Sequence, residues 1–265
     1  MLKIKNLEKI FYKGTPNENR AIKKIDLKVN EGDFITIVGS NGAGKSTLLN
    51  SIAGVFPIDN GSIILNDEDI TDKSEYKCAQ NIGRVFQNPL AGTSPEMTIE
   101  ENLSLAISKS HNLSLKWGLS KKKRKIMREH LQKIDLGLEE RLTTKVKLLS
   151  GGQRQALTLL MATVANPQLL LLDEHTAALD PATAIKIKNL TAELVNENNI
   201  TTLMITHNME DAIKMGNRLI MMDGGEIIYD IKGEEKENLN IEKLMKMFEI
   251  KHGGKFNNDR MLLSV

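Results

Sequence analysis

The residues with the clearest chemical potential form a glycine-rich loop between an apolar run and a stretch with helical spacing. GSNGAGKST follows FITIV, a short run typical of a buried strand, and satisfies the pattern G-x-x-x-x-G-K-[ST]. Backbone N–H groups in such a loop, together with the dipole of the following helix, bind phosphate. An ordinary glycine-rich turn is the alternative, and the strand-loop-helix context favours phosphate binding. The loop residues are Gly39, Ser40, Asn41, Gly42, Ala43, Gly44, Lys45, Ser46 and Thr47.

Four side chains are expected to act on a bound nucleoside triphosphate. Lys45 is predicted to reach the β- and γ-phosphates, and Ser46 is predicted to ligate Mg²⁺. QLLLLDE, residues 168–174, ends an apolar strand in two carboxylates at the sheet edge where the loop is also expected. Asp173 is predicted to hold Mg²⁺, and Glu174 to polarise the attacking water as general base. An exposed acidic turn is the alternative, which the upstream phosphate loop makes less favourable.

A second glycine-containing segment, LSGGQ, directly precedes the helical stretch RQALTLLMATVA. Its glycines are poor choices inside a helix but suit a phosphate-binding helix N-terminus, with Ser150 as both cap and ligand. A plain capped helix start is the alternative. The position of the segment between the phosphate loop and the carboxylates favours ligand binding. The residues concerned are Ser150, Gly151, Gly152 and Gln153.

Composition indicates a folded globular chain. The 265 residues are 40% hydrophobic and 26% charged, near ordinary globular values. A net charge of +2 gives no global field of the kind expected for a dedicated nucleic-acid binder. The single cysteine, Cys78, cannot form an internal disulfide, and a reducing cytoplasm is expected. Because neither a signal peptide nor a run of about 18 apolar residues is found, a membrane role would need another chain.

The elements that must position these residues follow from periodicity and turn signals. Residues 1–37 predict strands, and apolar runs at 168–173 and 201–206 with a helix between them predict a parallel sheet covered on both sides. Asn60-Gly61 before SIIL, and Asp223-Gly224-Gly225 between LIMM and EIIY, predict two β-hairpins. A β-rich beginning and an α/β core are therefore expected.

A mainly helical pattern from about residue 97 to 161 predicts a helical insertion, placed at roughly residues 90–160. It contains the basic run SKKKRKIMREH, which could suggest nucleic acid or anionic lipid. A solvated helix face is favoured, because acidic residues dilute the run and Trp117 is the lone aromatic residue for base stacking. Nucleic acid is therefore not expected as a partner. In the charged tail, IEKLMKMFEI predicts a short helix, and the last dozen residues are expected to be loose.

With these segments in place, the chain resembles the nucleotide-binding subunits of ABC transporters over about residues 1–230. GSNGAGKST matches Walker A, LSGGQ matches the ABC signature, and LLLLDE matches Walker B. VFQNP supplies Gln87 of the Q-loop, AALD supplies Asp180 of the D-loop, and THN supplies His207 of the switch loop. The resemblance implies a Mg²⁺-dependent ATPase with ATP and Mg²⁺ as ligands.

The resemblance also implies that two subunits sandwich two ATP molecules, each held by Walker A of one chain and the signature of the other. Gln87 would then touch Mg²⁺ or the nucleophilic water, and His207 would contact the γ-phosphate. An aromatic residue near the N-terminus usually stacks on adenine in this family. Phe11 aligns best and Tyr12 is the reserve, with simple core packing as the alternative.

Two features leave alternatives open. Asp180, followed by a proline, also fits a helix N-cap, so a purely structural role stands beside the D-loop role. His175 stands where most members of the family have proline after the Walker B carboxylates. We favour a neutral substitution there over an added donor near the phosphates. DEHTAALDP and VFQNPLAGTSPEMTIEENL resemble, more narrowly, the importer subclass linked to tryptophan or tyrosine uptake.

The expected fold is α/β: a P-loop NTPase core with a mostly parallel sheet, an N-terminal antiparallel β-subdomain and an inserted helical subdomain. Residues 1–232 are expected to form the ATP-binding domain, and residues 233–265 a charged extension that is partly helical or loose. The expected partners are a second copy bound through ATP, a membrane permease and an extracytoplasmic binding protein, at the cytoplasmic face of the membrane. A soluble ABC ATPase acting on DNA or ribosomes is the alternative, which the single cassette without coiled-coil or zinc insertions disfavours.

Overall fold

The computed structural model describes residues 1–108 and 120–251. The chain divides into two compact units, Met1–Cys78 with Thr201–Val265, and Ala79–Ile200, and each is described by itself. Trp117 and the last dozen residues lie outside the described residues. Within the described part, no helix combines the length and apolar character needed to cross a membrane.

An antiparallel sheet begins the first unit, as the period-two pattern predicts. Its order is β2 (Asn19–Val29), β1 (Leu2–Phe11), β4 (Asn60–Leu65) and β5 (Glu68–Asp69). β1 pairs with both β2 and β4, and its side chains Leu2, Ile4 and Leu7 are buried. Alternation of buried and exposed residues indicates a sheet with one face packed on the core.

Parallel strands form the centre of the first unit. β3 (Phe34–Gly39) lies between β8 (Thr201–Ile205) and β9 (Arg218–Asp223) and is parallel to both, and β10 (Glu226–Lys232) pairs antiparallel with β9. β8 is buried along its whole length and β3 is buried up to Val38, which explains their continuous apolar sequences. Two helices of this unit, α1 (Lys45–Ile52) and α7 (Met209–Lys214), directly follow the loops after β3 and β8.

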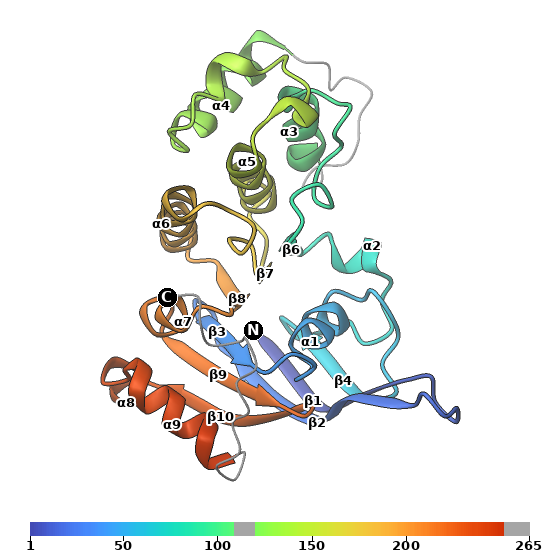
Figure 1. The fold of residues 1–265 in the computed structure, drawn as a ribbon. Helices are drawn as coiled ribbons and strands as arrows, with labels where there is room; N and C mark the ends of the chain where they lie inside the picture. Colours follow the sequence, from blue (N-terminus) through green and yellow to red (C-terminus); the bar gives the residue numbers. More distant parts are fainter. Residues whose placement is uncertain (109–119, 252–265) are drawn as a thin grey trace. The chain divides into compact units, whose positions relative to one another are not determined.

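The end of the described chain packs on this sheet. α8 (Glu234–Glu237) and α9 (Ile241–Lys251) follow β10, as Figure 1 shows. Leu239, Leu244 and Phe248 join a buried cluster with Leu219 and Ile231 of the two last strands. The helix predicted over IEKLMKMFEI is therefore confirmed as α9, and its apolar face is part of the core of this unit.

One hairpin prediction is confirmed and the other is wrong. Gly224-Gly225 joins β9 to β10 as predicted. Asn60-Gly61, however, is no hairpin turn, because it begins β4 and Asn60 pairs with Glu8 of β1. Gly61 is needed for close approach at a bulge, since a Cβ there would lie 2.4 Å from the Lys5 carbonyl oxygen. The hairpin instead turns at Asn66-Asp67, where φ is 47° and 63°, as a type I′ turn requires.

The second unit joins two parallel strands to a group of helices. β6 (Ile82–Val85) pairs with β7 (Leu169–Asp173), which leads to α6 (Pro181–Glu197). The insertion holds α3 (Ile99–Ser108), α4 (Lys121–Gln132) and α5 (Gly151–Thr163), with two 3₁₀ turns, Glu139–Arg141 and Val146–Leu148. The helical character predicted for the insertion is confirmed over its described residues.

The basic run forms α4, as predicted. Ser120 caps the helix by accepting a hydrogen bond from the Lys123 amide, and Met127 and Leu131 are buried. Arg124 donates two hydrogen bonds, of 2.6 and 2.9 Å, to the buried carboxylate of Glu100 in α3. The run is thus an amphipathic helix, which Arg124 ties to α3.

Candidate active site

The phosphate loop lies between β3 and α1, as predicted. Gly42 and Gly44 have φ of 80° and 94°, a left-handed conformation that glycine adopts readily. A Cβ on Gly44 would lie 2.4 Å from the carbonyl oxygen of Ala21 in β2, so this position also requires a glycine for space. The neighbouring β9–β10 turn supports the loop, since the amide of Gly225 donates to the carbonyl oxygen of Ala43 at 3.2 Å.

Lys45 is buried against the loop that it follows. Its Nζ donates hydrogen bonds to the carbonyl oxygens of Gly39 at 2.8 Å and Ser40 at 2.9 Å. The Ser40 hydroxyl in turn donates to a carboxylate oxygen of Asp223 at 2.9 Å. The ammonium group is therefore held within the loop, which concentrates positive charge where phosphate binding is predicted.

The predicted adenine-stacking residue is partly buried beside a second aromatic ring. The Phe11 and Phe56 rings meet edge to face, with centroids 5.3 Å apart and an interplanar angle of 81°. Lys9 Nζ lies 5.3 and 5.2 Å from the two ring centroids. Tyr12, the reserve, is 71% exposed. Phe11 therefore packs against another ring, whereas Tyr12 is largely exposed to solvent.

His207 lies two residues after the end of β8 and directly before Asn208, the cap of α7. It is half-buried, and its neighbour Asn208 caps α7 by accepting a hydrogen bond from the Asp211 amide at 2.9 Å. The Asn208 amide donates to the hydroxyl of Thr206 at 3.1 Å. These two bonds fix the backbone on both sides of His207.

In the second unit, the structure brings two of the predicted catalytic residues together. Gln87 follows β6, and Asp173 and Glu174 stand at the end and just beyond the end of β7, where Val85 pairs with Leu172. Gln87 Nε2 donates a hydrogen bond to Glu174 Oε2 at 3.1 Å. Glu174 has φ of 47°, which is uncommon for a residue other than glycine. A glutamine and a carboxylate therefore meet at the carboxyl edge of two parallel strands.

His175 is buried, which the sequence did not indicate. Its side chain is 3% exposed, and Nε2 lies 2.9 Å from the hydroxyl oxygen of Thr191 in α6. Burial, with a smaller contribution from the charge of Lys188, lowers the pKa of His175 to about 4. The ring is therefore neutral at neutral pH, and it contacts a helix of its own unit.

The LSGGQ segment has the predicted cap. Ser150 Oγ accepts a hydrogen bond from the amide of Gln153 at 3.2 Å, and the Gln153 side-chain oxygen accepts one from the Ser150 amide at 3.2 Å. This reciprocal arrangement is a capping box. A Cβ on Gly152 would lie 2.2 Å from a methyl group of Thr183 in α6, so the second glycine also permits close helix packing.

Asp180 caps α6, as the alternative interpretation predicts. Its carboxylate accepts a hydrogen bond from the Thr183 amide at 3.0 Å, and Pro181 opens the helix. Hydrogen bonds from the Thr183 hydroxyl and amide lower the pKa of Asp180. The cap accounts for the aspartate structurally and leaves its role toward a nucleotide a prediction.

The residues predicted to hold Mg²⁺ can be compared with the ligands that this ion prefers in proteins. Within residues 1–108 and 120–251, no group of three or more His, Cys, Asp or Glu side chains could hold a metal. Mg²⁺ is usually bound by one or two carboxylates with waters and substrate phosphates. The oxygen donors predicted for it, from Ser46, Gln87 and Asp173, fit that preference.

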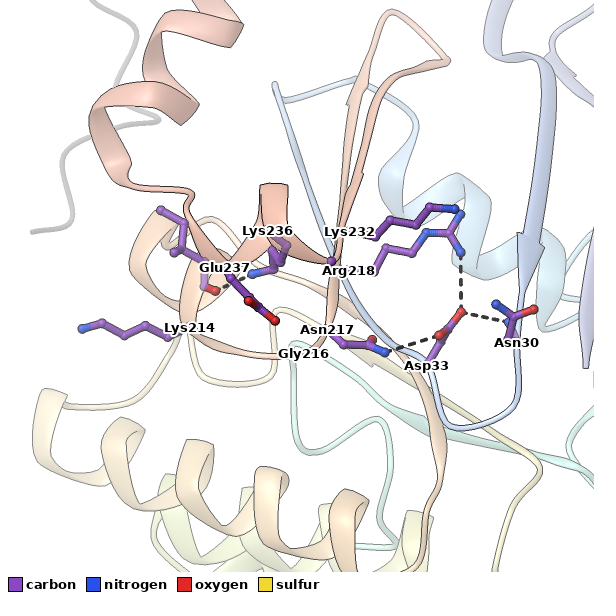
Figure 2. A pocket seen from close by; sticks show the side chains of 11 residues that line it. Asn30, Asp33, Lys214, Gly216, Asn217, Arg218, Lys232, Lys236 and Glu237 are labelled. Carbon is purple, nitrogen blue, oxygen red and sulfur yellow. Dashed lines mark hydrogen bonds and ion pairs between the residues drawn. The ribbon is translucent and has the colours of Figure 1, made fainter.

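The first unit also has a pocket of about 810 Å³, and Figure 2 shows the side chains that line it. Asp33 stands directly before β3, whereas the loop directly follows that strand, so the pocket is at the other end of β3. Arg218 pairs with Asp230 at 2.6 Å and with Asp33 at 3.5 Å. The basic residues that line the pocket are Lys214, Arg218, Lys232 and Lys236.

The sequence matches a family model described as ABC transporter over residues 22–177. It is 48% identical over 250 residues to the tyrosine transport ATP-binding protein of Clostridioides difficile (strain R20291), covering 94% of this chain and 99% of that protein. It is 34% identical over 242 residues to the energy-coupling factor transporter ATP-binding protein EcfA2 of Clostridium tetani (strain Massachusetts / E88), covering 90% of this chain and 81% of the relative.

Solved structures of similar fold include a dimeric, post-hydrolysis state of the ATP-binding cassette MJ0796 bound to ADP and Pi. That structure has a TM-score of 0.75 and 32% sequence identity, and the match covers 88% of this chain and 98% of that one. A nucleotide-free ATP-binding cassette from an ABC transporter has a TM-score of 0.74 and 28% identity, with 95% and 98% covered.

Proposed function

This chain belongs to the ABC transporter family, and from that premise we propose that it hydrolyses ATP to drive the import of an aromatic amino acid of the tyrosine class. One observation carries the substrate class. The tyrosine transport ATP-binding protein of Clostridioides difficile shares 48% of its residues with this chain over nearly the full length of both.

We assign ATP binding to the loop between β3 and α1. The backbone N–H groups around Gly42 and Gly44 would surround the phosphates, and Lys45 would neutralise the charge that develops on the γ-phosphate. The Phe11 ring is the proposed adenine contact, and His207 the proposed γ-phosphate contact. Mg²⁺, held by Ser46, Asp173 and Gln87, would supply charge neutralisation at the β- and γ-phosphates.

Glu174 is the proposed general base. Its carboxylate accepts a hydrogen bond from Gln87 Nε2 at 3.1 Å, which orients the carboxylate at the carboxyl edge of β6 and β7. A general base acts only within hydrogen-bond reach of the proton that it takes. Gln87 therefore serves, in this proposal, to hold the carboxylate as well as to contact Mg²⁺ or water.

The proposed active form is a dimer in which residues 150–153 of one chain bind the ATP held by the other. The capped start of α5, with Ser150 at its N-terminus, is suited to bind an anion. A dimeric structure of the related cassette MJ0796, bound to ADP and Pi, supports this arrangement. Asp180, at the start of α6, is proposed to contribute to the same junction.

The proposed partners beyond the second copy are a membrane permease and an extracytoplasmic binding protein, with this chain at the cytoplasmic face of the membrane. Deleting the gene should lower uptake of labelled tyrosine by intact cells, and wild-type chain should restore it, whereas the Lys45→Ala chain should not. Unchanged uptake in the deletion strain would contradict the substrate class. Salt-resistant binding to DNA or ribosomes, without recovery in the membrane fraction, would contradict the transport role.

A further inference from the structure

The backbone of Glu174, the proposed general base, has a strained conformation that other contacts must stabilise. Its φ of 47° lies in the left-handed region, where a side chain other than glycine is under strain. Such a conformation persists only when the surrounding structure fixes it. On the preceding side, β7 is fixed by pairing with β6, up to Val85 and Leu172. The following side therefore decides whether the turn is held from both ends.

His175 provides a contact on that following side. Its buried ring lies 2.9 Å, measured from Nε2, from the hydroxyl oxygen of Thr191. The hydroxyl of Thr191 donates its own proton to the carbonyl oxygen of Ile187 at 2.8 Å. Because a hydroxyl has one proton to give, His175 Nε2–H must be the donor in the bond to Thr191. This fixes both the tautomer and the orientation of the ring.

Thr191 is a rigid anchor. Thr191 lies in the interior of α6 (Pro181–Glu197) and is 0% exposed. The bond from its hydroxyl to the carbonyl one turn earlier restricts its side-chain rotamer. A residue held by this hydroxyl is therefore held by the body of a 17-residue helix.

We infer that His175 is a positioning residue for ATP hydrolysis: its hydrogen bond to Thr191 holds the turn in which Glu174 presents its carboxylate beside Gln87. The inference rests on the proposed function, because it concerns the group assigned there as general base. His175 is assigned no contact with nucleotide or water, and it acts through the backbone of its neighbour. A small displacement of a catalytic group can lower the rate strongly without affecting substrate binding.

The test removes the hydrogen bond with little change in shape. Thr191→Val is close to isosteric and lacks the acceptor, whereas Thr191→Ser keeps the hydroxyl. Thr191→Val should lower kcat for ATP by roughly tenfold or more and leave KM for ATP near the wild-type value. Thr191→Ser should retain most of the wild-type kcat. Thr163→Val is the matched control, because Thr163 is also buried in a helix and bonds the carbonyl of Leu159 at 3.0 Å without a histidine.

A second comparison separates positioning from general stability. In a Glu174→Gln background, Thr191→Val should cause no further fall in residual hydrolysis, because the group that it positions is already lost. An equal fall in both backgrounds, or a wild-type kcat in folded Thr191→Val protein, would overturn the inference. If Thr191→Val does not fold, kcat is compared between His175→Phe and His175→Gln. Only the glutamine keeps a donor, so kcat should be higher in His175→Gln than in His175→Phe, and equal values would overturn the inference.

The same experiment distinguishes failure of the inference from failure of the proposed function. If Glu174→Gln alone leaves kcat unchanged, Glu174 is not the base, and the proposed chemistry is wrong. If Glu174→Gln lowers kcat while Thr191→Val and His175→Phe both keep the wild-type value, the base assignment stands and the positioning role is wrong.

Discussion

At the scale of single residues, Lys45 is the clearest link between the fold and ATP. The ammonium group is buried in the loop, where it donates to the carbonyl oxygens of Gly39 and Ser40. A bound phosphate would offer the same donor an anionic partner, so that both groups of the hydrogen bond would be charged. The loop thus holds the ammonium close to where the phosphate is proposed to bind.

We predict that Lys45→Ala weakens ATP binding by roughly tenfold to a hundredfold, since a hydrogen bond to a charged group contributes about 1.5–3 kcal/mol. The protein should still fold, because the β3 and α1 cores do not depend on the ammonium. A calorimetric titration with ATP measures the affinity. Lys28→Ala, at an exposed strand lysine, is the control. Wild-type affinity in a folded Lys45→Ala protein would contradict the loop assignment.

The buried Lys236 makes the free energy of unfolding depend on pH in the alkaline range. Its Nζ donates to the carbonyl oxygens of Ala212 at 2.7 Å and of Ile213, and burial lowers its pKa from 10.5 to about 8. Below about pH 8, both folded and unfolded chains hold the proton, and the fold bears the cost of burying it. Between about 8 and 10.5 the folded chain loses the proton first, so this contribution to stability rises with pH.

The check is urea denaturation of wild-type and Lys236→Met protein at several pH values. The free energy of unfolding of the wild type should rise relative to that of Lys236→Met as the pH increases through this window. Lys243→Met is the control, since Lys243 is exposed and bonds a single carbonyl, that of Asn238, at 2.9 Å. A difference between wild type and Lys236→Met that stays constant with pH would contradict the burial of the charge.

At the scale of elements, the start of α5 serves two purposes. Its capping box satisfies the first amide groups of the helix, and Gly152 lets the helix approach α6 at Thr183. The LSGGQ sequence is therefore under a packing constraint as well as the ligand-binding role proposed for it. This packing constraint applies to Gly152 and not to Gly151, because a Cβ on Gly151 would meet its nearest atom, in Leu179, at an ordinary contact distance of 3.8 Å.

We predict that Gly152→Ala lowers the free energy of unfolding by about 1–3 kcal/mol, the usual cost of overpacking. Gly151→Ala should be neutral or slightly stabilising, because alanine is the better helix former. Thr183→Ser removes the methyl group that a Cβ at position 152 would meet, so it should restore part of the loss. Thermal or urea unfolding measures all three. A Gly152→Ala protein as stable as Gly151→Ala would show that the helices do not pack so closely.

Local sequence signals predicted the elements that depend on local chemistry. The phosphate loop, the Ser150 and Asp180 caps and the Gly224-Gly225 hairpin all follow from residues within a few positions of each other. The prediction of a hairpin at Asn60-Gly61 is wrong because Gly61 lies in a strand against the backbone of Lys5, which is far away in the sequence. The burial of His175 was likewise hidden, since its partner Thr191 lies 16 residues further on.

At the scale of the whole molecule, the proposed reaction depends on a second copy of the chain. The phosphate loop would supply one side of the ATP site, and Ser150 with the following glycines of the partner chain would supply the other. Glu174→Gln removes the proposed base and keeps Lys45, Ser46 and Asp173, which are proposed to hold ATP and Mg²⁺. In the proposed arrangement both chains contact the same ATP, so the dimer binds ATP better than the monomer and unhydrolysed ATP should drive association.

The most direct measurement is size-exclusion chromatography with light scattering on Glu174→Gln, with and without Mg²⁺-ATP, alongside its rate of hydrolysis. We predict a rate at least about a hundredfold below wild type, since a general base commonly contributes about 10²- to 10⁴-fold. We also predict a dimer with Mg²⁺-ATP, a monomer without it, and a monomer in both conditions when Ser150→Arg is added. Hydrolysis at the wild-type rate, or a monomer that holds ATP, would contradict the proposed paired site.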